Sequence, residues 1–127
     1  MKRLLLGLIM MLALPVVLAD VSVMHSLEQK QDGLYVHAFV NTDSASRFDI
    51  GELIPADLKI ENWTTTAKNV QFESTTGDFM GETYTVNHWM FNGPENDFEI
   101  VYRIPAAAQG IVSVWFYPNG FAMENVN

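Results

Sequence analysis

The stretch that decides the fold runs from residue 82 to residue 104 and reads ETYTVNHWMFNGPENDFEIVYRI. Its first ten residues alternate: positions 84, 86, 88 and 90 share one face, and positions 83 to 91 with odd numbers share the other. A second alternating run follows at residues 98 to 104, after the turn-forming segment at residues 92 to 97. A period of two interrupted by Asn-Gly-Pro predicts two consecutive strands joined by a turn.

The rest of the chain from residue 20 onward has the same character, with short β-prone runs separated by turn residues. Residues 34 to 40 are apolar on both faces except at His37, which indicates a central strand. Residues 48 to 53 are interpreted as a short edge piece, and residues 74 to 81 as a loop. Residues 105 to 109 give the only hint of helix, too short to stand alone. Further strands are expected at residues 21–27, 58–64, 68–73, 111–117 and 121–124.

Seven to nine short strands in about 100 residues predict an all-β fold, an antiparallel β-sandwich or barrel. The pattern is similar to immunoglobulin-like and fibronectin-like sandwiches, although the paired cysteines of antibody domains are absent. Trp63, Trp89 and Trp115 belong to three separate predicted strands. We expect all three to pack in or beside the core, because large aromatic rings dominate such interiors.

Residues 1 to 19 have the features of a signal peptide. Lys2 and Arg3 precede an unbroken apolar run at residues 4 to 14, Pro15 follows, and Ala19 ends a stretch of small and aliphatic residues. The alternative is an uncleaved membrane anchor, but the run is shorter than the roughly 20 residues of a spanning helix. With no cysteine in the chain, lipid attachment at cysteine is excluded.

The predicted organisation is therefore a cleaved signal peptide, residues 1–19, followed by a single β-sandwich domain, residues 20–127. The mature domain would be periplasmic or secreted, with no stable membrane insertion after cleavage. Removal of Lys2 and Arg3 leaves five basic residues against fifteen acidic ones, a net charge of −10. Such a surface repels nucleic acid and favours cationic partners.

The sharpest candidate for chemistry is the triplet His88-Trp89-Met90. On a strand, His88 and Met90 point to the same side, about 7 Å apart. An imidazole beside a thioether suits Cu(I), and Met80 could supply a third ligand, with Met24, His25 and His37 as further choices. The pair resembles the methionine–histidine sites of periplasmic copper chaperones, without their repeated Met-x-Met pattern. The alternative is that Met90 packs in the core and His88 is a hydrogen-bonded, half-buried histidine.

Acidic loops give a second candidate, a calcium site assembled from several loops. Calcium requires six or more oxygen ligands, and no EF-hand string is present. The candidate carboxylates fall in three loops: Asp43 and Asp49, Asp78 and Glu82, Glu95 and Asp97.

No motif identifies an enzyme. The chain lacks a Gly-x-Ser-x-Gly elbow, and a cysteine nucleophile is impossible. We therefore expect an exported, non-enzymatic module without a resident cofactor that binds a protein partner of cationic character. It could act as an inhibitor, a chaperone or a component of a surface assembly. The alternatives are a periplasmic copper- or other metal-binding protein that uses His88 and Met90, and a small hydrolase with a deep pocket and two facing titratable groups.

One segment bears directly on partner binding. Residues 111 to 117 are nearly continuous in apolar and β-prone character. Such a segment must be buried centrally or covered by a partner.

Overall fold

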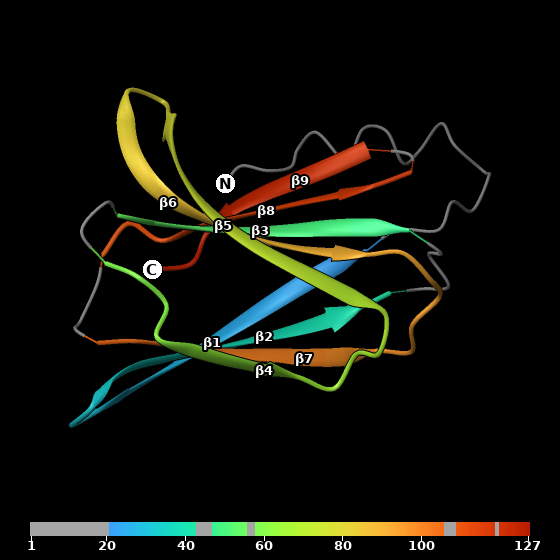
Figure 1. The fold of residues 1–127 in the computed structure, drawn as a ribbon, viewed down its shortest axis with the longest axis horizontal. Coiled ribbons are helices and arrows are strands. Elements are labelled where there is room, and N and C mark those ends of the chain that lie inside the picture. The colour runs from blue at the N-terminus through green and yellow to red at the C-terminus, as the bar shows by residue number, and fades with distance from the viewer. Residues whose placement is uncertain (1–20, 43–46, 56–57, 106–108, 119) are drawn as a thin grey trace, which may run out of the picture.

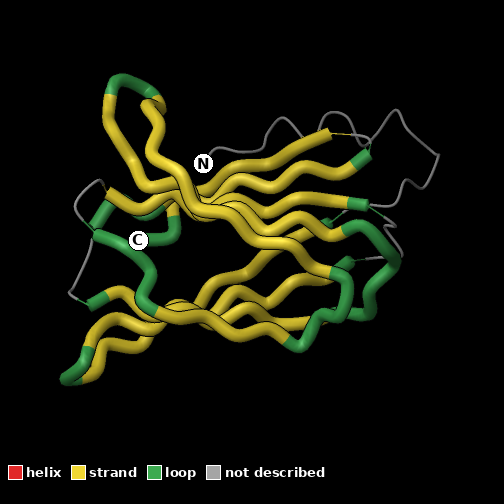
Figure 2. Tube along the Cα trace, in the orientation of Figure 1, coloured by secondary structure: helices red, strands yellow, loops and turns green. Residues whose placement is uncertain are grey.

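The computed structural model describes residues 21–42, 47–55, 58–105, 109–118 and 120–127. They form two antiparallel sheets packed face to face, seen as two layers in Figure 1 and Figure 2. The predicted antiparallel β-sandwich of seven to nine strands is confirmed, with nine strands: β1 (Ser22–Lys30), β2 (Gly33–Asn41), β3 (Phe48–Pro55), β4 (Asn62–Thr65), β5 (Val70–Phe79), β6 (Glu82–Phe91), β7 (Phe98–Ile104), β8 (Val112–Tyr117) and β9 (Gly120–Asn125).

The strand order is β1-β2-β7-β4 in the four-stranded sheet and β5-β6-β3-β8-β9 in the five-stranded sheet. Strands β1, β2, β3, β4, β7, β8 and β9 occupy, in chain order, the positions of strands A to G in a constant-type immunoglobulin sandwich. The β5–β6 hairpin is the addition. It enters the chain between the fourth and fifth of these strands and extends the second sheet beyond β3, and its tip bends away from the sandwich (Figure 1).

Two of the expected elements differ from the structure. Residues 48 to 53, interpreted as an edge piece, belong to β3, which lies in the middle of its sheet between β6 and β8. Residues 74 to 79, expected in a loop, continue β5, which pairs with β6 from Val70↔Phe91 to Phe79↔Glu82. The long alternating run of β6 offers a partner to every residue of β5, and this pairing outweighs the turn tendency of Gly77.

The signal peptide predicted at residues 1–19 and most of the expected helical segment lie outside the described residues. Within the part that the structure describes, no helix has the length and apolar character needed to cross a membrane.

The core lies between the two sheets and is built around Trp89, which is fully buried. Trp63 packs edge-on against it with ring centroids 5.8 Å apart, and Tyr102 stacks at 5.9 Å. Trp115 is buried as well, and its indole N–H donates to the carbonyl of Val21 at 2.8 Å. The expectation that the three tryptophans pack in or beside the core is confirmed.

Two glycines with positive φ allow a test of the β2–β7 register. Gly33 (φ +142°) is the first residue of β2, and a Cβ there would overlap the carbonyl oxygen of Ile104. Gly81 (φ +83°) has open space around the corresponding position. We expect Gly81→Ala to lower the free energy of unfolding by about 1 kcal/mol from backbone strain alone. Gly33→Ala should lower the free energy of unfolding by more, on the order of 2–3 kcal/mol, because the overlap with Ile104 adds to the backbone strain. Urea denaturation of both variants measures this, and equal losses would contradict the register.

Candidate functional site

The predicted copper ligands are only partly brought together. His88 and Met90 project from the outer face of β6, and the Nε2 atom of His88 lies 3.7 Å from Oδ2 of Asp49 on β3. Met80 occupies the turn between β5 and β6, eight residues from His88, which corresponds to as much as ~26 Å of extended chain. The remaining candidate ligands belong to the four-stranded sheet: Met24, His25 and His37.

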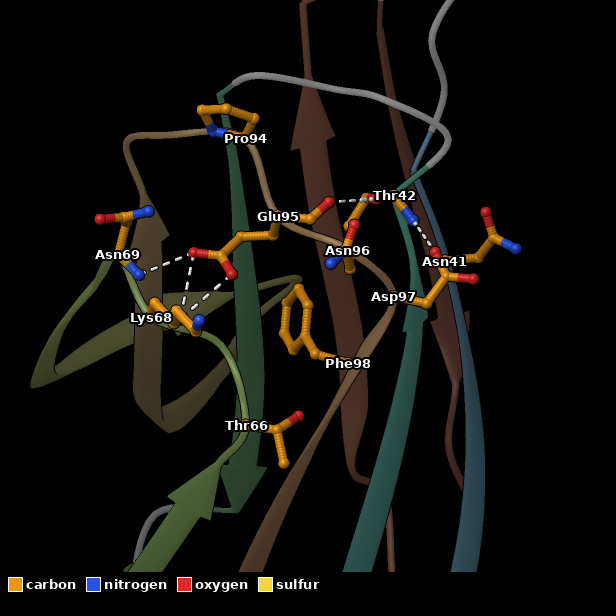
Figure 3. A pocket seen from close by; sticks show the side chains of 10 residues that line it. All are labelled: Asn41, Thr42, Thr66, Lys68, Asn69, Pro94, Glu95, Asn96, Asp97 and Phe98. Atoms are coloured by element: carbon orange, nitrogen blue, oxygen red, sulfur yellow. Dashed lines mark hydrogen bonds between the residues drawn. The ribbon is translucent and has the colours of Figure 1, made fainter.

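Carboxylates of the third predicted calcium loop tie neighbouring loops together (Figure 3). The carboxylate of Glu95 accepts the backbone N–H groups of Lys68 at 3.1 Å and Asn69 at 2.7 Å. Asp97 Oδ1 accepts the backbone N–H of Thr42 at 3.0 Å. These residues border an open hollow of about 1020 Å³ at one end of the sandwich. Their oxygens therefore accept hydrogen bonds from amides of neighbouring segments and connect these segments.

The other acidic loops do not converge on the third. Asp78 accepts a hydrogen bond from the Thr83 hydroxyl at 2.9 Å, across the β5–β6 hairpin. Asp43 falls outside the described residues. Over the ranges that the structure describes, no three His, Cys, Asp or Glu side chains are grouped so that they could share a metal ion.

A buried polar cluster lies between the sheets, centred on Glu52 of β3, which is 0% exposed. Its Oε1 accepts the Tyr102 hydroxyl at 2.6 Å. Its Oε2 accepts the Ser113 hydroxyl and lies 3.0 Å from Nε2 of His25. The partners come from β7, β8 and β1, so both sheets contribute. A carboxylate is tolerated at such a position because it is met by hydrogen bonds and by a potential cation.

His25 contacts a second carboxylate through its other ring nitrogen. Nδ1 lies 3.4 Å from Oε2 of Glu124 on β9. Burial by itself lowers the pKa of His25, but the hydrogen bonds and charges of Glu52 and Glu124 outweigh it, so the pKa is raised above 6.5. Burial, reinforced by the charge of Glu52, raises the pKa of Tyr102 well above its ordinary value. The cluster is thus arranged to hold an imidazolium between two carboxylates.

Sequence reasoning missed Glu52, although a signal was present. Phe48, Ile50 and Ile54 are the other inward positions of β3, so Glu52 is a charged residue in an apolar series. A charged residue in such a series indicates a buried polar contact, which an edge strand would not require. The cluster contains acid–base groups, but they line neither of two surface hollows. One hollow is bordered by Glu95 and Asp97, and the other by Asp49 and Phe116.

The outer face of the five-stranded sheet carries exposed apolar side chains on β8 and β9. We call Val114, Phe116, Phe121 and Met123 the apolar patch. Phe121 is 64% exposed and Phe116 is 49% exposed, and their ring centroids are 5.8 Å apart. The cross-strand pairs Phe116↔Phe121 and Val114↔Met123 place all four on the same face. The patch was not predicted as such, although residues 111 to 117 were expected to need a central position or a partner.

Two acidic groups share the outer face with the apolar patch, and one of them borders it. Asp49 lies directly across from Phe116 on β3, and Glu73 lies further along the same face on β5. Among the outward positions of the five strands there is no Lys or Arg. Arg47, just before β3, stands at the border of a shallow hollow of about 450 Å³ that is also lined by Asp49 and Phe116. The outer face therefore joins an apolar surface to an acidic one.

Comparison with known proteins gives no family. No protein-family model matches the chain, and no curated protein matches it. Among solved structures, the chain is similar to the chitin-binding domain of a hyperthermophilic chitinase from Pyrococcus furiosus. The two are 10% identical, the match covers 87% of this chain and 98% of that domain, and the TM-score is 0.48. We draw no functional conclusion from a likeness this distant.

The buried cluster leads to a prediction about stability. At pH 6, we expect His25→Leu to lower the free energy of unfolding by about 3–5 kcal/mol, because Glu52 is left buried without its cation. The double variant His25→Leu, Glu52→Leu should lose less of the free energy of unfolding than the single variant does, since no buried charge remains. Urea unfolding followed by tryptophan fluorescence measures both.

The matched control for this prediction is the half-buried pair of His88 and Asp49 on the outer face of the five-stranded sheet. His88→Leu should change the free energy of unfolding by less than about 1 kcal/mol, as is usual for a surface ion pair. Equal losses for His25→Leu and His88→Leu would contradict a buried ion pair at Glu52.

Proposed function

We propose that this chain is a non-catalytic binding module that recognises a basic protein through the apolar patch. The observation that carries the proposal is the exposed Phe116–Phe121 pair on a sheet face whose charged strand residues, apart from His88, are acidic. Contiguous exposed apolar side chains mark interaction sites in soluble proteins. Aromatic anchors surrounded by polar groups are the usual arrangement of an interface hot spot.

Charge complementarity favours a basic partner. The chain has fifteen acidic and seven basic residues, and the acidic excess grows if the predicted signal peptide is removed. Asp49 and Glu73 lie on the same face as the apolar patch, where a partner's lysines or arginines could pair with them. Such pairing accelerates association and makes it sensitive to salt. The same charge disfavours nucleic acid and disfavours self-association through this face.

The hollow beside Phe116 suits an anchoring side chain of the partner. Met90 and Phe116 form apolar walls, and Asp49 and Arg47 stand at its border. An apolar side chain that enters it would be desolvated, while a neighbouring basic group could reach Asp49. Anchors in such positions contribute most of the binding energy of an interface.

The remaining features support a binding role in preference to catalysis. The only buried acid–base cluster found among the described residues is centred on a fully enclosed carboxylate, Glu52. A general base must come within hydrogen-bonding distance of a substrate proton. On the basis of the predicted signal peptide, we expect the module to act in the periplasm or outside the cell.

The test is capture of a defined partner band from extracellular or periplasmic extract by immobilised protein. We expect Phe116→Ser and Phe121→Ser each to weaken capture by at least tenfold, the loss of a hot-spot side chain. Phe39→Ser, an exposed phenylalanine on the opposite sheet, is the matched control and should capture normally. Raising the salt concentration should weaken capture by the unaltered protein.

Two outcomes would overturn the proposal. One is capture that Phe116→Ser and Phe121→Ser leave unchanged. The other is the absence of any patch-dependent protein partner together with retention on an insoluble polysaccharide such as chitin, which would indicate a carbohydrate-binding module.

A further inference from the structure

We propose that His25 is a pH-sensitive latch that fastens β9, and with it half of the apolar patch, to β1. The latch itself stands on the geometry of the buried cluster. Its consequence for partner binding rests on the proposed function of the patch.

The contact joins two edge strands of opposite sheets. β1 is the outermost strand of the four-stranded sheet, and β9 is the outermost strand of the five-stranded sheet. The side chain of His25 is only 4% exposed and reaches from β1 to two carboxylates on opposite sides of its ring. Nε2 meets Glu52 at 3.0 Å, and Nδ1 meets Glu124 at 3.4 Å.

The number of protons on the ring nitrogens decides to how many carboxylates His25 can donate a hydrogen bond. An imidazolium donates from both nitrogens, whereas a neutral imidazole donates from one. Glu52 is 0% exposed and Glu124 is 45% exposed, so an unpaired carboxylate costs far more at Glu52. The neutral ring therefore keeps its N–H on Nε2 for Glu52. Its bare Nδ1 then faces the carboxylate of Glu124, and the tie to β9 is lost.

Besides the His25 contact, β9 is held by its ladder with β8 and by the packing of Ala122 against the core. It is six residues long and pairs with β8 alone. The side chain of Glu124 points inward, while those of Phe121 and Met123 point outward into the apolar patch. When Glu124 is released, β9, which carries half of the apolar patch, should therefore separate from β8 more often.

The direction of the pH effect follows from the groups that surround His25. They are Glu52 on β3, Glu124 on β9 and Tyr102 on β7, with the neutral Ser113 on β8. Tyr102 and Ser113 donate to Glu52 and do not compete for the ring nitrogens. The folded protein raises the pKa of His25 above 6.5, so the latch is fully closed below about pH 6.5. It opens as the pH rises through the folded-state pKa.

Hydrogen exchange of the full chain, corrected for intrinsic rates, tests the latch without any partner. Between pH 5.5 and pH 8.5, we expect the protection of β9 amides to fall about fivefold relative to β6 amides, the size of one lost hydrogen bond. Glu124→Gln should abolish this difference, because the amide can accept from the charged ring and donate to the neutral one. His37→Gln is the control, since His37 also lies between two carboxylates, Glu28 and Glu99, but on the outer face of the other sheet.

Parallel changes in β9 and β6 would overturn the latch, and so would a Glu124→Gln variant that keeps the full pH response. These outcomes are independent of the patch's binding role. For a partner captured through the patch, the ratio of affinities at the two pH values should differ between the unaltered protein and Glu124→Gln. Equal affinity ratios in the two proteins would leave the hydrogen-exchange result standing. They would show, however, that the latch does not affect binding through the apolar patch.

Discussion

The burial of one carboxylate, Glu52, imposes the main constraint on this sandwich. An ionised group between two sheets must be hydrogen-bonded from each side from which water is excluded. Here β7 supplies a phenol, β8 a hydroxyl and β1 an imidazole, so three strands are fixed relative to β3 by one side chain. In a chain without cysteine, such a cluster does part of what a disulfide between sheets would do: it specifies which strands meet, at a cost in desolvation.

Much of the fold could be predicted from local pattern because the core follows it. The alternation of residues 82 to 104 places Trp89 and Phe91 inward on β6 and Tyr102 inward on β7, as the structure has them. Local pattern failed for β3 and for the second half of β5, since both depend on partners remote in sequence. Whether a strand is central or at an edge is decided by what pairs with it, which a single sequence does not record.

The candidate sites were harder to predict for the same reason. His88 and Met90 share a face, as the period of two requires, but Met80 is separated from them by the length of a hairpin. The cluster around Glu52 joins residues from five strands, with partners up to 99 positions apart. Composition indicated an acidic surface. It did not show that Asp49 would lie directly across from an exposed phenylalanine, with Glu73 on the same face, because that depends on strand order.

The buried cluster and the apolar patch are linked through strand register. On β8 and β9 the polar residues of the cluster, Ser113 and Glu124, alternate with outward apolar residues that include Val114, Phe116 and Met123. A slip of one residue would exchange the two sets. On β8 and β9 such a slip would bury Val114, Phe116 and Met123 and expose Ser113 and Glu124, but it would also expose Trp115, which is now buried. The hydrogen bonds of Glu52 oppose it, and so does the inward series of Phe48, Ile50 and Ile54 on the same strand. The exposure of the apolar patch is therefore a consequence of the register that the core and the cluster together impose.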